Sequence, residues 1–139
     1  MEYTQGQSGK TGSNRPQDAG PAIDQATFKE LQDLAGDDGG EFIRGILGDF
    51  IQDSTDRIAA IRSGFSAGDA QAVEEAAHSL KSSSAYVGAL RLSGINKQLQ
   101  DLGRGGDIAG AGNLIAELGR EFERVREAFA PHLGERVAG

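Results

Sequence analysis

A chain of 139 residues is long enough to bury one hydrophobic core, so we expect a single folded domain. The absence of cysteine excludes disulfides and thiolate metal sites, and the net charge of −7 argues against general nucleic-acid binding, which depends on cations that neutralise phosphates. The chain has no apolar run long enough to cross a membrane and no apolar signal segment at its start, so a cytoplasmic location is expected.

Residues 1–21 are rich in Gly, Ser, Gln and Asn and contain almost no large apolar side chains. Such a segment cannot bury enough surface to offset the entropy of ordering. We therefore expect a disordered tail or linker over 1–21, a helical bundle over 22–134 and a flexible C-terminus over 135–139.

The first two predicted helices differ in length. Asp24 has the side chain of an N-cap, and Gly36 is a suitable stop for a short helix that buries Phe28, Leu31 and Leu34. A long helix is expected from 41 to 63, with Gly64 and Gly68 bracketing the next turn. Its apolar residues recur at helical spacing; they are Phe42, Ile43, Ile46, Leu47, Phe50, Ile51, Ile58 and Ile61.

Three further helices complete the expected fold. Asp69 is the predicted N-cap of a helix that runs to about Tyr86, and a tight turn near Gly88 leads to a helix over 89–102. Glycines should end that helix, namely Gly103, Gly105 and Gly106. The last helix is expected over 108–129. Because no segment alternates as a strand would and the connections are short, we predict an all-α, antiparallel up-down four-helix bundle with an additional short N-terminal helix.

The third helix carries the side chains best suited to chemistry. His78, Lys81 and Ser82 share the face opposite its small and apolar stripe, because residues three and four apart are neighbours on a helix. An exposed imidazole supplies a nitrogen nucleophile near neutral pH, and a nearby ammonium supplies positive charge for phosphate oxygens. This face is therefore suited to capturing a phosphoryl group.

The region around His78 is also locally basic, although the whole chain is acidic. Residues 78–104 contain one acidic residue, Asp101, and four basic ones, namely Lys81, Arg91, Lys97 and Arg104. We expect these cations to form one surface that meets an anionic partner site.

Residues 77–100, AHSLKSSSAYVGALRLSGINKQLQ, resemble the signature of histidine-containing phosphotransfer (HPt) domains, in which A-H-x-L-K-G-S/A is followed a few residues later by G-A-x-x-L. The positions that match are Ala77, His78, Leu80, Lys81, Ser83, Gly88, Ala89 and Leu92. The order of the helices is similar as well, over about 22–133. One departure is Ser82, where the family usually has a glycine that lets a partner approach closely. The resemblance implies that phosphotransfer is retained and that Ser82 alters the fit to the partner.

The resemblance implies a role for each site residue. His78 would accept a phosphoryl group through Nε2 from a receiver-domain aspartate or a histidine kinase, and would pass it to another response regulator. Lys81 would offset charge on the transferred group. Gln100 would hold Nδ1 and so orient the ring. Partner binding is expected from Ser82, Tyr86, Arg91 and Lys97, whereas Gly88, Ala89 and Leu92 are expected to shape the turn and the packing.

The chain would then be a phosphocarrier and not a nucleotide-dependent enzyme, since it has no glycine-rich phosphate loop followed by lysine. No cofactor or metal of its own is expected, and Mg²⁺ would be held by the acidic pocket of the receiver domain. We expect a monomer, with no role for nucleic acid or membrane. His132, beside Pro131, is expected to be incidental.

Two alternatives remain open. The same bundle could bind and sequester receiver domains without accepting phosphate, and Ser82 favours this adaptor function. The sequence from Glu75 to His78 also has the Glu-x-x-His spacing of di-iron bundles, but one copy without partner carboxylates is a weak signal.

Overall fold

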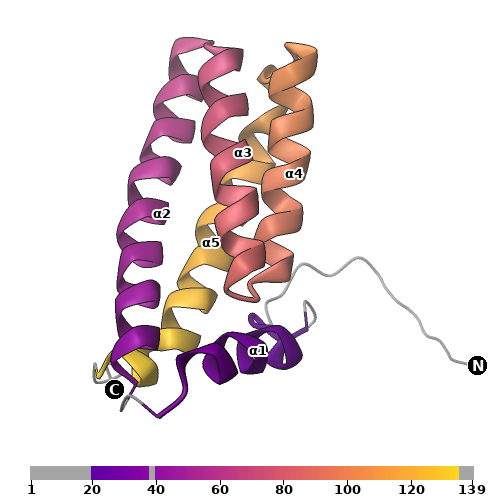
Figure 1. The fold of residues 1–139 in the computed structure, drawn as a ribbon. Coiled ribbons are helices and arrows are strands. Elements are labelled where there is room, and N and C mark those ends of the chain that lie inside the picture. The colour runs from indigo at the N-terminus through magenta and orange to yellow at the C-terminus, as the bar shows by residue number, and fades with distance from the viewer. Residues whose placement is uncertain (1–19, 38–39, 135–139) are drawn as a thin grey trace, which may run out of the picture.

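The computed structural model of the protein describes residues 20–37 and 40–134, and these residues form helices and no strands. Their order is α1 (Gln25–Ala35), α2 (Glu41–Ala67), α3 (Ala70–Tyr86), α4 (Leu90–Gly105), the 3-10 turn η2 (Ala109–Ala111), α5 (Gly112–Phe129) and the 3-10 turn η3 (Ala130–Leu133). Figure 1 shows α2 to α5 side by side with alternating direction, and α1 across the end where α3 turns into α4. The predicted bundle with its short N-terminal helix is confirmed. The predicted tail lies mostly, and the flexible C-terminus wholly, outside the described residues.

The core runs along the axis of the bundle and follows the predicted apolar spacing. Its largest fully buried side chains include Leu47, Ile61, Leu80, Leu92, Leu99, Leu118 and Phe129. Leu34 was predicted to be buried but is 74% exposed, because α1 packs on the bundle through Phe28 and Leu31, which are both buried. The last long helix begins at Gly112, later than predicted, because 109–111 form a tighter 3-10 turn.

Two glycines that were predicted to lie in or begin turns are inside helices. Gly64 belongs to α2 and Gly103 to α4, and both are buried. A Cβ atom on Gly64 would lie 3.2 Å from the side chain of Val73, so the missing side chain serves close packing of α2 on α3. The true stops are Gly68 and Gly106, whose φ angles of +70° and +76° favour glycine.

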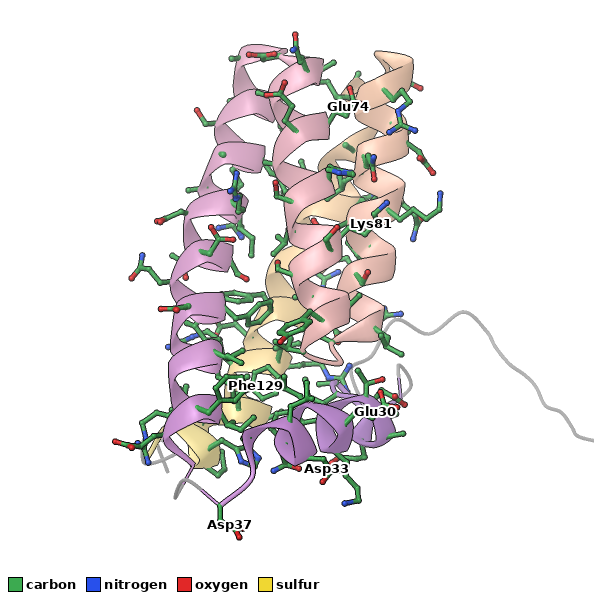
Figure 2. The ribbon with its side chains drawn as sticks, in the orientation of Figure 1. Glu30, Asp33, Asp37, Glu74, Lys81 and Phe129 are labelled. Atoms are coloured by element: carbon green, nitrogen blue, oxygen red, sulfur yellow. The ribbon has the colours of Figure 1, made fainter. Side chains whose placement is uncertain are left out.

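The N-terminal helix is attached to the turn between α3 and α4. The side chain of Asp24 accepts a hydrogen bond from the backbone of Thr27, which confirms the predicted N-cap. The backbone N–H of Asp24 donates to the carbonyl of Gly88 over 2.7 Å. The ring of Phe28 packs against that of Phe129, with 5.5 Å between the centroids, at the end of the bundle that Figure 2 shows beside α1. These contacts fix the end of the α3–α4 hairpin.

Candidate functional site

His78 lies in the middle of α3, on a face that faces solvent. Its neighbours Ala77 and Leu80 are completely buried, so the period of the helix turns His78 outward. The imidazole is exposed, as the sequence predicted. A partner can therefore reach the ring without displacing any element of the fold.

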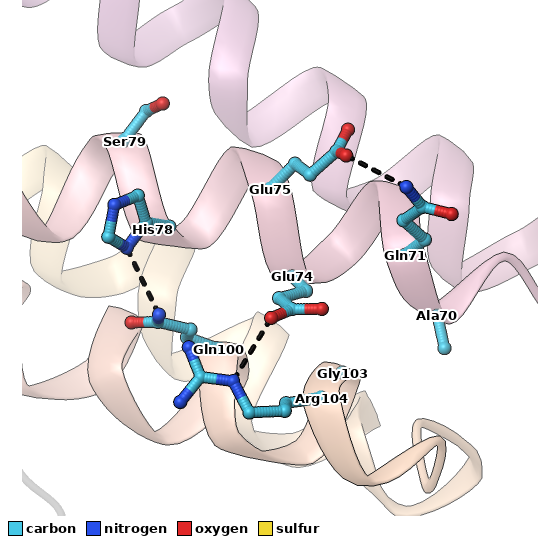
Figure 3. A pocket seen from close by; sticks show the side chains of 9 residues that line it. All are labelled: Ala70, Gln71, Glu74, Glu75, His78, Ser79, Gln100, Gly103 and Arg104. Carbon is cyan, nitrogen blue, oxygen red and sulfur yellow. Dashed lines mark hydrogen bonds and ion pairs between the residues drawn. The ribbon is translucent and has the colours of Figure 1, made fainter.

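Gln100 of α4 holds the inner nitrogen of this ring. Its amide nitrogen lies 3.0 Å from Nδ1 of His78, and Gln100 itself is only 4% exposed (Figure 3). The predicted contact is thus present, and it comes from a side chain that packing keeps in place. Among the described residues, Nε2 of His78 has no hydrogen-bond partner, so this nitrogen is the one that remains available.

The protonation of the ring depends on which end of the amide faces Nδ1. When the amide N–H donates to Nδ1, the proton of the neutral ring is on Nε2, which then has no free lone pair. When the carbonyl accepts from Nδ1–H, the lone pair is on Nε2. In the structure the carbonyl oxygen of Gln100 is buried without a partner, so a half-turn of the amide exchanges the two arrangements. Only the arrangement in which Gln100 accepts leaves a lone pair on Nε2 of the neutral ring.

An open groove of about 770 Å³ leads from His78 toward the start of α3. It is lined by Ala70, Gln71, Glu74, Glu75, His78, Ser79, Gln100, Gly103 and Arg104. An ion pair between Arg104 and Glu74, 3.1 Å apart, connects α4 to α3 across this groove (Figure 3). The sequence did not single out this pair, because opposite charges far apart in the chain become neighbours only once the two helices are known to pack together.

Lys81 and Ser82 lie one turn beyond His78. The Lys81 side chain is partly buried, and its backbone carbonyl accepts a 2.9 Å hydrogen bond from the hydroxyl of Ser93 on α4. Among the described residues, no carboxylate lies within ion-pair distance of Lys81. Ser82 is exposed, and its hydroxyl lies 3.5 Å from the backbone carbonyl of His78. The Lys81 charge is therefore available close to the histidine.

An exposed apolar pair flanks the turn between α3 and α4. Tyr86 is 54% exposed at the end of α3, and Leu90 is 48% exposed at the start of α4. Ser82 follows His78 by four residues and Tyr86 follows Ser82 by four, so the three lie along one strip of α3. Tyr86 was predicted to contact a partner, whereas Leu90 was not predicted and is found only from its exposure in the structure.

The expected basic surface is reduced by carboxylates that lie beside its cations. Arg91 is held against α5 by Glu117 at 2.6 Å and by the buried Glu121 at 3.3 Å. Lys97 pairs with Asp101 at 3.0 Å. Together with the Arg104 pair, three of the four cations of residues 78–104 are thus matched by carboxylates. Arg91 serves to join α4 to α5, and the prediction that it binds a partner receives no support from its position.

The pKa of Asp101 is lowered by the cations around it. The hydrogen bond from Lys97 holds the pKa of Asp101 below its ordinary value, against a smaller opposing effect of desolvation. The charges of Lys97, Arg104 and Lys81 act in the same direction as that hydrogen bond. This carboxylate therefore stays ionised at neutral pH and offsets the cations around it.

Other kinds of site find no support in the described part of the chain. No group of three or more His, Asp or Glu side chains there is placed to hold a metal ion, so Glu75 and His78 have no further ligands. No helix among residues 20–37 and 40–134 is long and apolar enough to span a membrane. His132 packs its ring against Phe28 at the far end of the bundle, with centroids 4.8 Å apart.

Comparison with known proteins agrees with this geometry. Residues 45–128, which include His78 and Gln100, match the family model of the Hpt domain. Among solved structures, the chain is similar to histidine-containing phosphotransfer protein B (HptB) from Pseudomonas aeruginosa PAO1, with 33% identity and a TM-score of 0.75 over 85% of this chain and 100% of that one. No curated protein matches significantly. The chain therefore belongs to the histidine-containing phosphotransfer (Hpt) family, whose domains are the phosphocarriers of phosphorelays.

Proposed function

We propose that this protein is a phosphorelay intermediate that accepts a phosphoryl group on Nε2 of His78 and passes it to the receiver domain of another response regulator. The donor is the aspartyl phosphate of a receiver domain, or a histidine kinase. One observation carries the proposal: an exposed imidazole whose inner nitrogen is held by the buried Gln100 while Nε2 is open to a partner.

The transfer needs only groups that the partners and His78 supply. The lone pair of Nε2 attacks phosphorus, and the bond from phosphorus to the donor aspartate breaks with its electron pair leaving on the carboxylate. The product is an Nε2-phosphorylated imidazolium whose Nδ1–H donates to the carbonyl of Gln100. In the second half, an acceptor aspartate attacks phosphorus and the electron pair of the N–P bond returns to Nε2.

Lys81 and the partner neutralise the charge of the transferred group. The Lys81 ammonium, close to His78 and without an ion pair among the described residues, offsets the phosphoryl oxygens. The Mg²⁺ ion is contributed by the acidic pocket of the receiver, so this chain uses no cofactor of its own. A cytoplasmic location and a monomeric state, expected from the sequence, are part of the same proposal.

Docking of the receiver is assigned to the strip that starts at His78 and ends at the apolar pair. Ser82 lies between His78 and Tyr86, and Leu90 extends the apolar surface onto α4. Since most of the nearby cations already have partners, burial of apolar surface is the main source of affinity here, and Lys97 contributes at the rim.

The test is transfer of a radioactive phosphoryl group. Incubation with a phosphorylated receiver and Mg²⁺ should label the protein with an acid-labile, base-stable phosphate. His78→Gln should abolish the label, because the amide has no nucleophilic nitrogen. His132→Gln is the control and should be labelled like the unaltered protein, since His132 packs on Phe28 away from the groove. Labelling of the His78→Gln variant would contradict the assignment.

The adaptor function is the second candidate, and Ser82 is the observation that favours it. An adaptor binds a receiver without acquiring phosphate. Ser82→Gly restores the small residue that the family usually has at this position. If only this variant becomes labelled while the unaltered protein binds receivers unlabelled, the natural chain is an adaptor.

A further inference from the structure

We propose that Gly103 is a positioning residue for His78. Its missing side chain lets α4 contact the backbone of α3 one turn away from the Gln100–His78 pair, and this contact sets the distance between Gln100 and the ring. The kinetic consequence rests on the proposed phosphoacceptor role of His78, whereas the geometric consequence does not.

The contact at Gly103 is between backbones. A Cβ atom at this position would lie 2.8 Å from the backbone nitrogen of Glu74, 2.9 Å from the carbonyl oxygen of Ala70 and 3.0 Å from the Cα atom of Glu74. Real Cβ atoms do not approach other atoms so closely, and no flexible side chain is present that could move aside. Any larger residue at 103 must therefore push α3 and α4 apart or distort one of them.

The two contacts are neighbours on both helices. Gly103 follows Gln100 by three residues, and Glu74 precedes His78 by four, so one helical turn separates the contacts on each side. The spacing continues along α4, because the hydroxyl of Ser93 donates to the carbonyl of Lys81 and the buried Asn96 lies between Ser93 and Gln100. Small and polar residues thus face α3 along this seam, in place of large apolar ones.

The packing at Gly103 controls the hydrogen bond between Gln100 and His78, because a hydrogen bond tolerates only a small increase in distance. The amide of Gln100 lies 3.0 Å from Nδ1, and a separation larger by about 0.6 Å no longer makes a hydrogen bond. Helices in close-packed contact move as stiff units. A methyl group at 103 therefore loosens the grip of Gln100 on the ring without touching either residue.

The experiment compares Gly103→Ala with Gly105→Ala. Gly105 is in the last turn of the same helix and has open space where a Cβ atom would be. Nitrogen-15 NMR of His78 reports which ring nitrogen carries the proton. We expect Gly103→Ala to change the proportion of the two neutral tautomers of His78 and to lower the rate of phosphotransfer about tenfold. Gly105→Ala should leave both unchanged. A Gly103→Ala protein that is folded by circular dichroism and keeps the tautomer and the rate would overturn the proposal.

Two further variants separate positioning from general destabilisation. If Gly103 acts through Gln100, Gly103→Ala should cause no further loss of rate in a Gln100→Leu background, and an equal loss there would overturn the proposal. Should Gly103→Ala fold poorly, it is measured in a background stabilised by Gly45→Ala and Gly48→Ala, two exposed helical positions of α2 with open space. The tautomer measurement needs no partner protein. Absence of phosphotransfer by the unaltered protein would therefore contradict the proposed function, whereas the effect of Gly103 on the tautomer could still be measured.

Discussion

The two residues that assist His78 differ in how firmly they are held. Gln100 is buried in the α3–α4 interface, and its amide contacts the ring directly. The backbone carbonyl of Lys81 accepts from Ser93, and among the described residues its ammonium has no ion pair, so under the proposed function it can follow the phosphoryl group. Orientation of the ring is therefore a property of the packed bundle, and neutralisation of charge is a property of one flexible side chain.

Replacing Gln100 by leucine separates orientation from stability. Leucine fills a similar volume but cannot hold Nδ1, so we expect the transfer rate to fall about tenfold. The free energy of unfolding should change by less than about 1 kcal/mol, because the carbonyl of Gln100 is already buried without a partner and its loss removes that cost. Single-turnover transfer and urea denaturation measure the two quantities. An unchanged rate would show that the ring needs no support from α4.

At this scale the sequence predicted the contact between Gln100 and His78, because the resemblance to the family implied a role for each of the two residues. It could not predict what Arg91 does. A long cation on a helix has two neighbouring helices within reach, and only the packing of α4 on α5 shows that Glu117 and Glu121 are closer than the histidine face.

At the scale of the elements, α1 is stabilised at its start by a side-chain cap. The carboxylate of Asp24 accepts from both the backbone and the hydroxyl of Thr27, at 3.0 and 2.6 Å. Both hydrogen bonds lower the pKa of Asp24, and the bond from the Thr27 hydroxyl has the larger effect. A carboxyl group whose pKa is lower in the folded protein than in the unfolded chain stabilises the fold at neutral pH. That contribution is lost as the pH falls through the lowered pKa.

We therefore expect Asp24→Ala to lower the midpoint of thermal unfolding by a few degrees at pH 7. The difference from the unaltered protein should shrink as the pH is lowered, because protonation removes the same interaction from Asp24. Thermal unfolding followed by circular dichroism over a pH series measures this. Asp33→Ala is the matched control, since Asp33 is on the same helix but pairs with Lys29 only at the exposed surface. An effect of equal size at all pH values would exclude the cap as its cause.

The two helix starts with an aspartate cap were predicted correctly, whereas the glycine stops expected at Gly64 and Gly103 were not, for a physical reason. Asp24 and Asp69 act locally, through hydrogen bonds to backbone groups three residues on, so the sequence contains the whole interaction. A glycine can end a helix by adopting a left-handed backbone conformation, or it can lie inside a helix where another helix packs closely against it. Gly106 is of the first kind and Gly103 of the second, and only the neighbouring α3 distinguishes them.

For the molecule as a whole, the distribution of charge differs from what the sequence suggested. Segment 78–104 has a net positive charge in the sequence, but in the fold carboxylates from α3 and α5 pair with its arginines. The large side chains exposed at the end of the docking strip are Tyr86 and Leu90. Under the proposed function, a receiver would therefore be recognised more by shape and burial than by long-range attraction.

This leads to a prediction for docking. Tyr86→Ala combined with Leu90→Ser should raise the receiver concentration needed for half-maximal transfer roughly tenfold, with the maximal rate nearly unchanged. Raising the salt concentration from about 0.05 to 0.5 M should change that concentration much less, because few unpaired charges remain to be screened. Leu34→Ser is the control, since Leu34 is more exposed than either residue but lies on α1. A steep dependence on salt with no effect of the double substitution would show that charge controls docking.

The position of His78, halfway along one side of a single helix, has a consequence for how a relay through this molecule runs. Under the proposed function the same nitrogen, Nε2, receives and gives up the phosphoryl group, so donor and acceptor compete for the same place and cannot be bound together. Transfer under the proposed function must then follow a ping-pong order, in which the first partner leaves before the second arrives. Tight association with either partner would slow the relay by delaying that exchange. An excess of acceptor receiver bound to the unphosphorylated protein would inhibit phosphorylation of His78 by the donor.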